Sequence, residues 1–247
     1  MKRILITIAA ALLALSLQAK DYKLLSPDGS IEIMVQSGTN LSWSISKGGT
    51  AVLEPSCMGL TLTDGSQWGL GSKVRKATRR SIAQELDAQN FKRSKVKDCF
   101  NELRLSFKDF DLIVRAYDDG AAYRFVAVQK GDFTVKDERA DFRFPEDCRA
   151  FIPYVKKKGK SFEGQFANAF ENLHSVSKVS GWENGRLAFL PLTLDAPGGG
   201  KICITESDLL NYPGMFLSNE DADTSLEAVF APCPKEVVQG GHGNLMG

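Results

Sequence analysis

Residues 102–128, with the sequence ELRLSFKDFDLIVRAYDDGAAYRFVAV, predict three consecutive β-strands. Apolar and polar side chains alternate from 102 to 107, and β-branched and aromatic residues are frequent in 111–117 and 121–128. The intervening Asp118-Asp119-Gly120 favours a tight hairpin, because glycine adopts positive φ without steric cost. This stretch therefore predicts antiparallel strands joined by short turns.

The same kind of pattern continues on both sides of this stretch. Alternating or short apolar runs bounded by turn residues predict further strands at residues 31–35, 41–45, 51–53, 59–63, 133–135, 140–144, 150–152, 187–194 and 202–205. No segment keeps a helical period beyond a turn or two, and neither a repeat nor a linker interrupts the chain. We therefore expect one mostly β domain, a large sandwich of antiparallel sheets.

One stretch lacks this pattern. Residues 73–97 are rich in charged side chains and show no regular alternation. High polarity without a period is typical of exposed connections. We expect a loop region at a sheet edge here.

The first nineteen residues have the features of a secretory signal peptide. Met1-Lys2-Arg3 precedes an apolar run from Ile4 to Leu17, and Ala19 is a small residue before a polar start. The run is shorter than a membrane span, and no second one follows. The alternative is a buried first helix. We expect cleavage after Ala19, leaving residues 20–247 as one exported domain with no membrane association, periplasmic in a Gram-negative bacterium.

Composition indicates a globular protein without nucleic-acid partners. Charged residues make up 25% of the chain, hydrophobic residues 43%, and the formal net charge is +1. The basic run Lys156-Lys157-Lys158 with Lys160 is better explained as a solvated loop than as a phosphate site. The five cysteines are odd in number and lack a Cys-x-x-Cys pair, which argues against a zinc site. One or two disulfides can form after export, with at least one thiol left free.

Four segments in order along the chain carry a family resemblance. They are Ser26-Pro27-Asp28-Gly29, YDDGAAYRF at 117–125, Phe170-Glu171-Asn172-Leu173 and ITESDLLNYPGM at 204–215. Together they resemble the N-terminal domain of the family 97 glycoside hydrolases, from about residue 21 to residue 242. The resemblance implies a galactose-mutarotase-like super-sandwich.

The resemblance also implies partners. Its members are exo-acting α-glucosidases and α-galactosidases whose chemistry sits on a (β/α)8 barrel following this domain. It implies that barrel or an α-linked oligosaccharide as partner, and a calcium ion (Ca2+) to which the sandwich lends a carboxylate. The matching position here is Glu171. Calcium needs several oxygen ligands, so Glu171 requires ligands from the barrel.

By resemblance, the sequence ends inside the family's N-terminal domain, so we expect the sandwich to lack its last strands. A glycosidase needs two carboxyl groups at the scissile bond, and the family takes both from the barrel. We therefore expect no catalytic residue in this truncated chain. Open sheet edges and an uncovered apolar face also predict poor solubility or association in isolation.

Three further residues are candidates for sugar binding. Glu206 and Asp208 end a predicted strand and open a loop, although a turn held by side-chain-to-backbone hydrogen bonds explains them equally well. Trp182 lies in a turn-rich segment and is a candidate for stacking on a sugar ring. Trp43 alternates with serines in a strand and is predicted to fill the core.

Two other functions remain open. The first is a stand-alone lectin-like glycan binder, which calorimetry with α-linked oligosaccharides distinguishes. The second is an aldose 1-epimerase-like enzyme on a related sandwich, which pairs a histidine with a glutamate. Its candidates here are His174 and Glu206.

Overall fold

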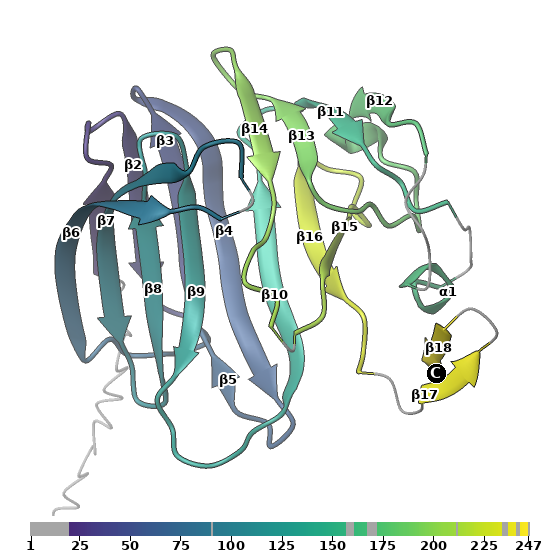
Figure 1. The fold of residues 1–247 in the computed structure, drawn as a ribbon, viewed down its shortest axis with the longest axis horizontal. Coiled ribbons are helices and arrows are strands. Elements are labelled where there is room, and N and C mark those ends of the chain that lie inside the picture. Colours follow the sequence, from purple (N-terminus) through teal and green to yellow (C-terminus); the bar gives the residue numbers. More distant parts are fainter. Residues whose placement is uncertain are drawn as a thin grey trace, which may run out of the picture.

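The computed structural model describes residues 20–89, 91–156, 161–166, 172–210, 212–233, 237–240 and 243–246. Almost all regular structure in these residues is β (Figure 1). The exceptions are the four-residue helix α1 (Glu163–Phe166) and one 3-10 turn, Val179–Gly181. The expected mostly β class is confirmed.

Eight strands form one large antiparallel sheet. Its spatial order is β1 (Lys20–Leu25), β2 (Ile31–Ser37), β3 (Ser42–Lys47), β4 (Thr50–Leu62), β10 (Val135–Arg143), β16 (Ser225–Phe230) and β15 (Met215–Ser218), with β5 (Gln67–Trp68) paired to β4. In β2 every second residue is buried, as expected for a strand with one face on a core.

Two four-stranded sheets lie in front of the large sheet in the view of Figure 1. The first contains β6 (Lys76–Asp87), β7 (Lys95–Ser106), β8 (Phe110–Ala116) and β9 (Ala121–Ala127), and the second contains β12 (Ser175–Lys178), β11 (Arg149–Ile152), β13 (Leu192–Asp195) and β14 (Lys201–Ile204). A separate hairpin pairs β17 (Val237–Gly240) with β18 (Gly243–Met246).

The core joins all three main sheets. One continuous cluster of buried side chains includes residues of β2, β8 and β13, among them Ile33, Leu112 and Leu194, each 0% exposed. Trp43 on β3 meets Tyr123 on β9 edge to face, with ring centroids 4.9 Å apart. The prediction that Trp43 fills the core is confirmed, and the expected β-sandwich is the fold.

The structure corrects the expectation for residues 73–97. Most of this stretch belongs to β6 and the first part of β7, which form a long antiparallel hairpin. Nearly every side chain of β6 is exposed, so neither face shows the apolar alternation that marks a half-buried strand. Only the backbone hydrogen bonding between β6 and β7 defines these strands, and the order of polar and apolar side chains does not reveal it.

Two smaller differences concern strand boundaries and cysteines. The predicted strands 51–53 and 59–63 fall in the single strand β4, apart from Thr63, which lies just beyond its end. Only the end of 187–194 is a strand. All five cysteines are free, so no disulfide forms in this structure. Among the described residues, no helix has the length and apolarity needed to cross a bilayer.

Candidate functional site

Two of the predicted site loops leave the same end of the β12-β11-β13-β14 sheet. At this end Ile152 pairs with Ser175, and Leu192 pairs with Ile204. The connection 153–174 therefore starts and finishes here, and the connection 205–214 starts here. Glu171 belongs to the first connection, and Glu206 and Asp208 to the second. The topology brings together loops that the sequence separates.

Glu171 itself lies outside the described residues, but both flanks of its segment are placed. On the near side, α1 carries Gln165, whose side chain is 0% exposed. Its amide oxygen accepts a hydrogen bond from the Leu187 N–H at 3.0 Å, and its amide nitrogen donates to the Gly185 carbonyl at 2.8 Å. On the far side, Asn172 donates to the Tyr154 carbonyl at 3.4 Å. Buried polar contacts thus hold α1 in place.

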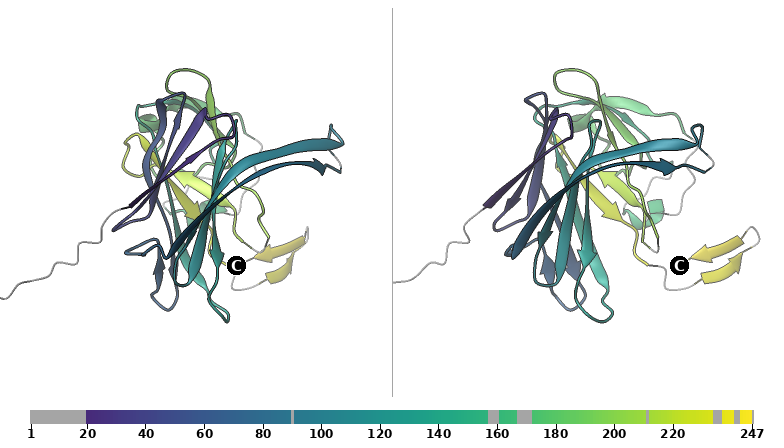
Figure 2. Two further views of the ribbon diagram at one scale, coloured as in Figure 1. Left: turned by 90° about the vertical axis from the view of Figure 1, so that its left-hand side faces the viewer. Right: turned by 60° about the vertical axis from the view of Figure 1, so that its left-hand side comes forward.

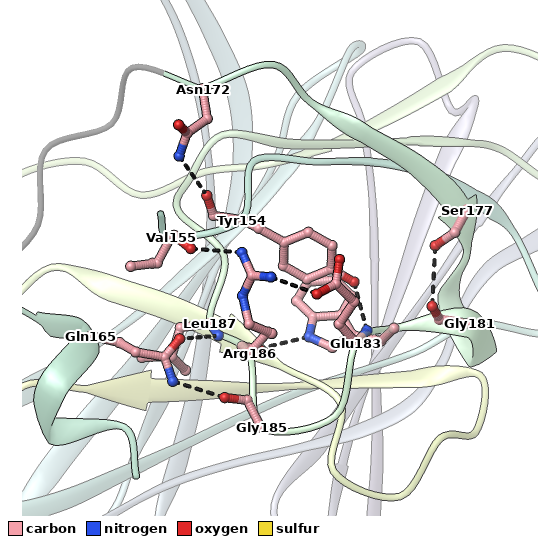
Figure 3. Close-up of polar contacts among 11 residues, drawn as sticks. Tyr154, Val155, Gln165, Asn172, Ser177, Gly181, Glu183, Gly185, Arg186 and Leu187 are labelled. Carbon is pink, nitrogen blue, oxygen red and sulfur yellow. Dashed lines mark hydrogen bonds and ion pairs between the residues drawn. The ribbon is translucent and has the colours of Figure 1, made fainter. Parts of the chain in front are cut away.

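Arg186 joins the segment that follows β11 to the turn that contains Glu183 (Figure 3). Its guanidinium donates to the Val155 carbonyl at 2.7 Å and to the Glu183 carboxylate, and it lies over the Tyr154 ring, 4.7 Å from the centroid. The Tyr154 hydroxyl accepts the Glu183 backbone N–H at 2.8 Å. Because the guanidinium is only 12% exposed, this network is a structural support rather than a surface charge.

The same network overturns the prediction for Trp182. Its side chain is 5% exposed and belongs to the core, not to a sugar-facing surface. The indole N–H donates to the Arg186 carbonyl at 2.8 Å, and the ring packs edge to face on Tyr154. A buried tryptophan satisfies its N–H in this way. Trp182 therefore offers no ring face to a ligand in this structure.

Glu206 has a defined orientation at the start of the second connection. Its Oε1 accepts the Met215 N–H at 2.8 Å, so it bridges the two ends of the 205–214 loop. A Cβ on Gly214 would lie 3.4 Å from that oxygen, which makes the contact close. Burial raises the pKa of Glu206, and the Met215 N–H opposes this shift.

Asp208 lies further along the same loop and is more exposed. Its backbone has φ of +61°, a left-handed conformation that aspartate tolerates better than most residues. Its carboxylate pairs with Arg124 of β9 at 3.2 Å, with both side chains more than half exposed. An exposed pair of this kind contributes little to stability. The contact positions the loop against β9 without fixing it strongly.

Glu138 and Tyr212 form a second contact between this loop and the large sheet. The Tyr212 hydroxyl donates to Glu138 Oε2 at 2.5 Å. Burial raises the pKa of Glu138, and the nearby negative charges of Glu206 and Asp137 act in the same direction. Burial and the Glu138 carboxylate also raise the pKa of Tyr212. The sequence interpretation missed this pair, because the two residues are 74 positions apart and neither belongs to a motif.

The described residues do not form a metal site by themselves. They contain no group of three or more His, Cys, Asp or Glu side chains arranged to hold an ion. Calcium normally takes six to eight oxygen ligands. The expected calcium therefore does not fit the described part of the chain alone, and a role for Glu171 stays a prediction.

The epimerase pair receives no support from the sheet topology. His174 immediately precedes β12, and Glu206 follows β14, which are the two edge strands of their sheet. Three inter-strand spacings separate these edges, about 14 Å at roughly 4.8 Å per strand. The two backbones are therefore far apart for side chains acting on one sugar carbon.

Sequence comparison gives the family. Residues 24–238 match the model described as the glycosyl-hydrolase 97 N-terminal domain. The chain belongs to this family. It is 41% identical over 248 residues to a retaining alpha-galactosidase of Bacteroides thetaiotaomicron, covering 99% of this chain and 38% of that relative. A probable retaining alpha-galactosidase of Streptomyces bingchenggensis is 30% identical over 148 residues, covering 58% of this chain and 23% of that protein.

Solved structures agree on the fold of this family 97 domain. A glycoside hydrolase family 97 enzyme from Pseudoalteromonas sp. strain K8 in complex with acarbose superposes with a TM-score of 0.72 at 20% identity, covering 85% of this chain and 32% of that one. A beta-arabinopyranosidase gives a TM-score of 0.74 at 22% identity, covering 88% and 36%. The chain thus spans about a third of the length of these proteins.

Proposed function

We propose that this domain supports the substrate pocket of a family 97 glycoside hydrolase and does not itself perform the chemical step. The observation that carries the proposal is the convergence of the 153–174 and 205–214 connections at one end of one sheet. One connection is held by the buried Gln165, and the other presents the oriented carboxylate of Glu206. Preorganised side chains of this kind suit a surface that completes a neighbouring site.

The carboxylates at this end support a non-catalytic role. A retaining glycosidase places two carboxyl groups about 5 to 5.5 Å apart on either side of the bond that breaks. Here Glu206 accepts the Met215 N–H, and Glu138 accepts the Tyr212 hydroxyl. Both groups are therefore engaged with the protein. The acid and the nucleophile come, in this proposal, from a separate catalytic domain.

The substrate class we propose is an α-galactoside, because the 41% identical relative is a retaining alpha-galactosidase. Glu171 would contribute one oxygen ligand to a calcium ion, with the remaining ligands from the catalytic domain. Residues 1–19 lie outside the described residues, so export through a cleaved signal peptide also stays a prediction. N-terminal sequencing of the secreted product tests it.

The test of the main proposal uses the mature chain, residues 20–247. Incubated with p-nitrophenyl α-galactoside and α-glucoside, it should release no nitrophenol, whereas the Bacteroides relative serves as the active control. Turnover by the isolated chain that is lost in Glu206→Gln would overturn the proposal. A fusion to the remaining part of the relative should restore activity, with Glu206→Gln raising KM more than it lowers kcat.

A stand-alone glycan binder is the second candidate, and one cavity favours it. A hollow of about 250 Å³ lies between the turn at Asp64 and the loop at Asp132 to Thr134, lined also by Gln129. Phe133, 39% exposed, offers a ring beside these polar groups, a combination that suits a sugar. Calorimetry with α-galactosides tests this candidate: binding that Phe133→Ala abolishes supports it, and silence at millimolar sugar rejects it.

A further inference from the structure

The far half of the β6–β7 hairpin projects from the body of the protein as a two-stranded arm. The two strands pair continuously from Lys76 with Ser106 to Asp87 with Lys95. Strand β8 covers β7 only from Asn101 to Ser106. Beyond that point the sheet has two strands, and Figure 2 shows them extending away from the rest of the molecule. We call residues 84–89 and 91–98 the arm.

The two faces of the arm differ in polarity. Strand alternation places Leu86 and Val96 opposite each other on one face, in line with the Ile82 and Phe100 pair nearer the body. The opposite face carries charged residues, including Glu85 and Lys95, whose side chains form an ion pair at 2.9 Å. The hydrogen-bonded pair of Gln84 and Asp98 lies on this same face between the Leu86–Val96 pair and Phe100, so the face is apolar only in part.

The apolar face of the arm is exposed in the described structure. Leu86 is 47% exposed, Val96 37% and Phe91, at the tip, 57%. An isolated two-stranded hairpin is marginally stable in water, and long edges without a partner favour association. A projecting hairpin with three exposed apolar side chains therefore has the properties of an element that packs on another surface.

The position of the arm indicates which partner packs on its exposed face. In both views of Figure 2 the arm and the β17–β18 hairpin project from the same side of the body. The match to the Bacteroides relative covers almost all of this chain but only 38% of the relative. Most of the relative therefore lies outside the matched region. A domain following the match would begin near β18, on the side toward which the arm extends.

We propose that the arm packs its Leu86–Val96 face on the catalytic domain of a family 97 enzyme and clamps that domain against the sandwich. This proposal rests on the proposed function for the partner, but it concerns a surface separate from the 205–214 loop. A second copy of the chain is the competing occupant. An arm that binds a second copy would make the isolated chain dimeric, and disruption of the same face would make it monomeric.

The experiment compares residues 20–247 alone with a fusion of residues 20–247 to the part of the Bacteroides relative beyond its matched region. Hydrogen exchange followed by mass spectrometry reports the amides of residues 84–98. We expect exchange about tenfold slower in the fusion. The double variant Leu86→Asp/Val96→Asp should lose this protection. Ala83→Asp, an exposed change on the opposite face of the same strand, should keep it.

A second measurement tests the proposal if the fusion does not fold. The two parts are co-expressed as separate chains, and lysine cross-linking tests for links from Lys92, Lys95 or Lys97 to the relative's part. Equal exchange in the fusion and the isolated chain overturns the proposal, and so does a complex without cross-links from the arm. The proposal is also overturned if the fusion does not fold and the co-expressed chains form no complex. A dimer of the isolated chain that the double variant dissociates overturns it as well. A fusion that carries the unsubstituted arm and has α-galactosidase activity, but shows no protection of the arm, rejects the clamp alone. Turnover by the isolated chain rejects the proposed function alone.

Discussion

Replacing Gln165 with alanine should destabilise the domain by about 3 kcal/mol. The Leu187 N–H lies on a residue that is 0% exposed, and without the Gln165 oxygen it has no replacement partner from water. An orphaned buried donor costs about 1–3 kcal/mol. The second lost hydrogen bond, to the partly exposed Gly185 carbonyl, adds about 1 kcal/mol, because water can reach that oxygen.

Urea unfolding measures this loss. With an m-value near 3 kcal/mol/M, the Gln165→Ala midpoint should fall by about 1 M without a change in slope. Tryptophan fluorescence and circular dichroism should give coincident transitions, which a domain of this size must show before a free energy is assigned. Gln89→Ala, at an exposed glutamine in the arm, is the matched control and should shift stability by less than about 0.5 kcal/mol.

Two outcomes would refute the reasoning. A Gln165→Ala midpoint equal to that of the control would mean that the buried amide is not a support. A large loss without faster amide exchange in 161–166 and 172–174 would mean that the support acts elsewhere. The expected pattern is faster exchange in these flanks of Glu171 and unchanged exchange in the arm.

Three further predictions concern other parts of the fold. Burial alone would raise the pKa of Glu102, but two arginines that bond its carboxylate hold that pKa below its ordinary value. The contribution of Glu102 to the free energy of unfolding is therefore present at neutral pH and lost as the pH falls through the folded-state pKa. Glu102→Ala should lower the free energy of unfolding, measured with urea at pH 7, by about 3 kcal/mol. The raised pKa of Glu138 has the opposite effect: its contribution to stability is present below the ordinary pKa and lost as the pH rises through the folded-state pKa. Glu138→Gln should therefore raise the urea midpoint at pH 7 relative to the midpoint at pH 4, compared with the unsubstituted chain. At Gly59 a Cβ would lie 2.6 Å from the Trp68 carbonyl oxygen, so Gly59→Ala should lower the free energy of unfolding by about 3 kcal/mol, whereas Gly120→Ala, with open space around it, should change it little.

The sequence predicted the strands that have at least one buried face. Strand β2 alternates because its neighbours exclude water from one side, and β8 runs apolar because both of its faces are buried. The same physics explains the error at 73–97, since a ribbon with solvent on both faces places no demand on side-chain polarity. Only the backbone ladder fixes such strands, and its partners are residues that a local pattern does not identify.

The site was predicted less well than the fold, and Trp182 shows why. A Gly- and Asn-rich segment indicates a turn, but it does not report the depth at which the turn packs. Here the arginine four residues later accepts the indole N–H at its carbonyl and stacks on Tyr154, so the turn folds inward. The buried contacts of Gln165 are made with residues twenty or more positions away, and no sequence motif indicates them.

The two connections at the site end of the sheet differ in how firmly they are held, and this difference bears on the proposed role. The described parts of the 153–174 connection are held by a buried hydrogen bond to Gln165 and a partly buried one from Arg186, each of which is costly to break. The 205–214 connection depends on the exposed ion pair between Arg124 and Asp208, on the exposed hydrogen bond from Tyr212 to Glu138, and on the partly buried Glu206 bond to the backbone. A pocket that a neighbouring domain completes needs one rigid wall to set its geometry and one wall that can adjust when the partner or the sugar arrives. In the proposed function, the described flanks of Glu171, residues 161–166 and 172–174, form the rigid wall, and the loop of Asp208 forms the adjustable one.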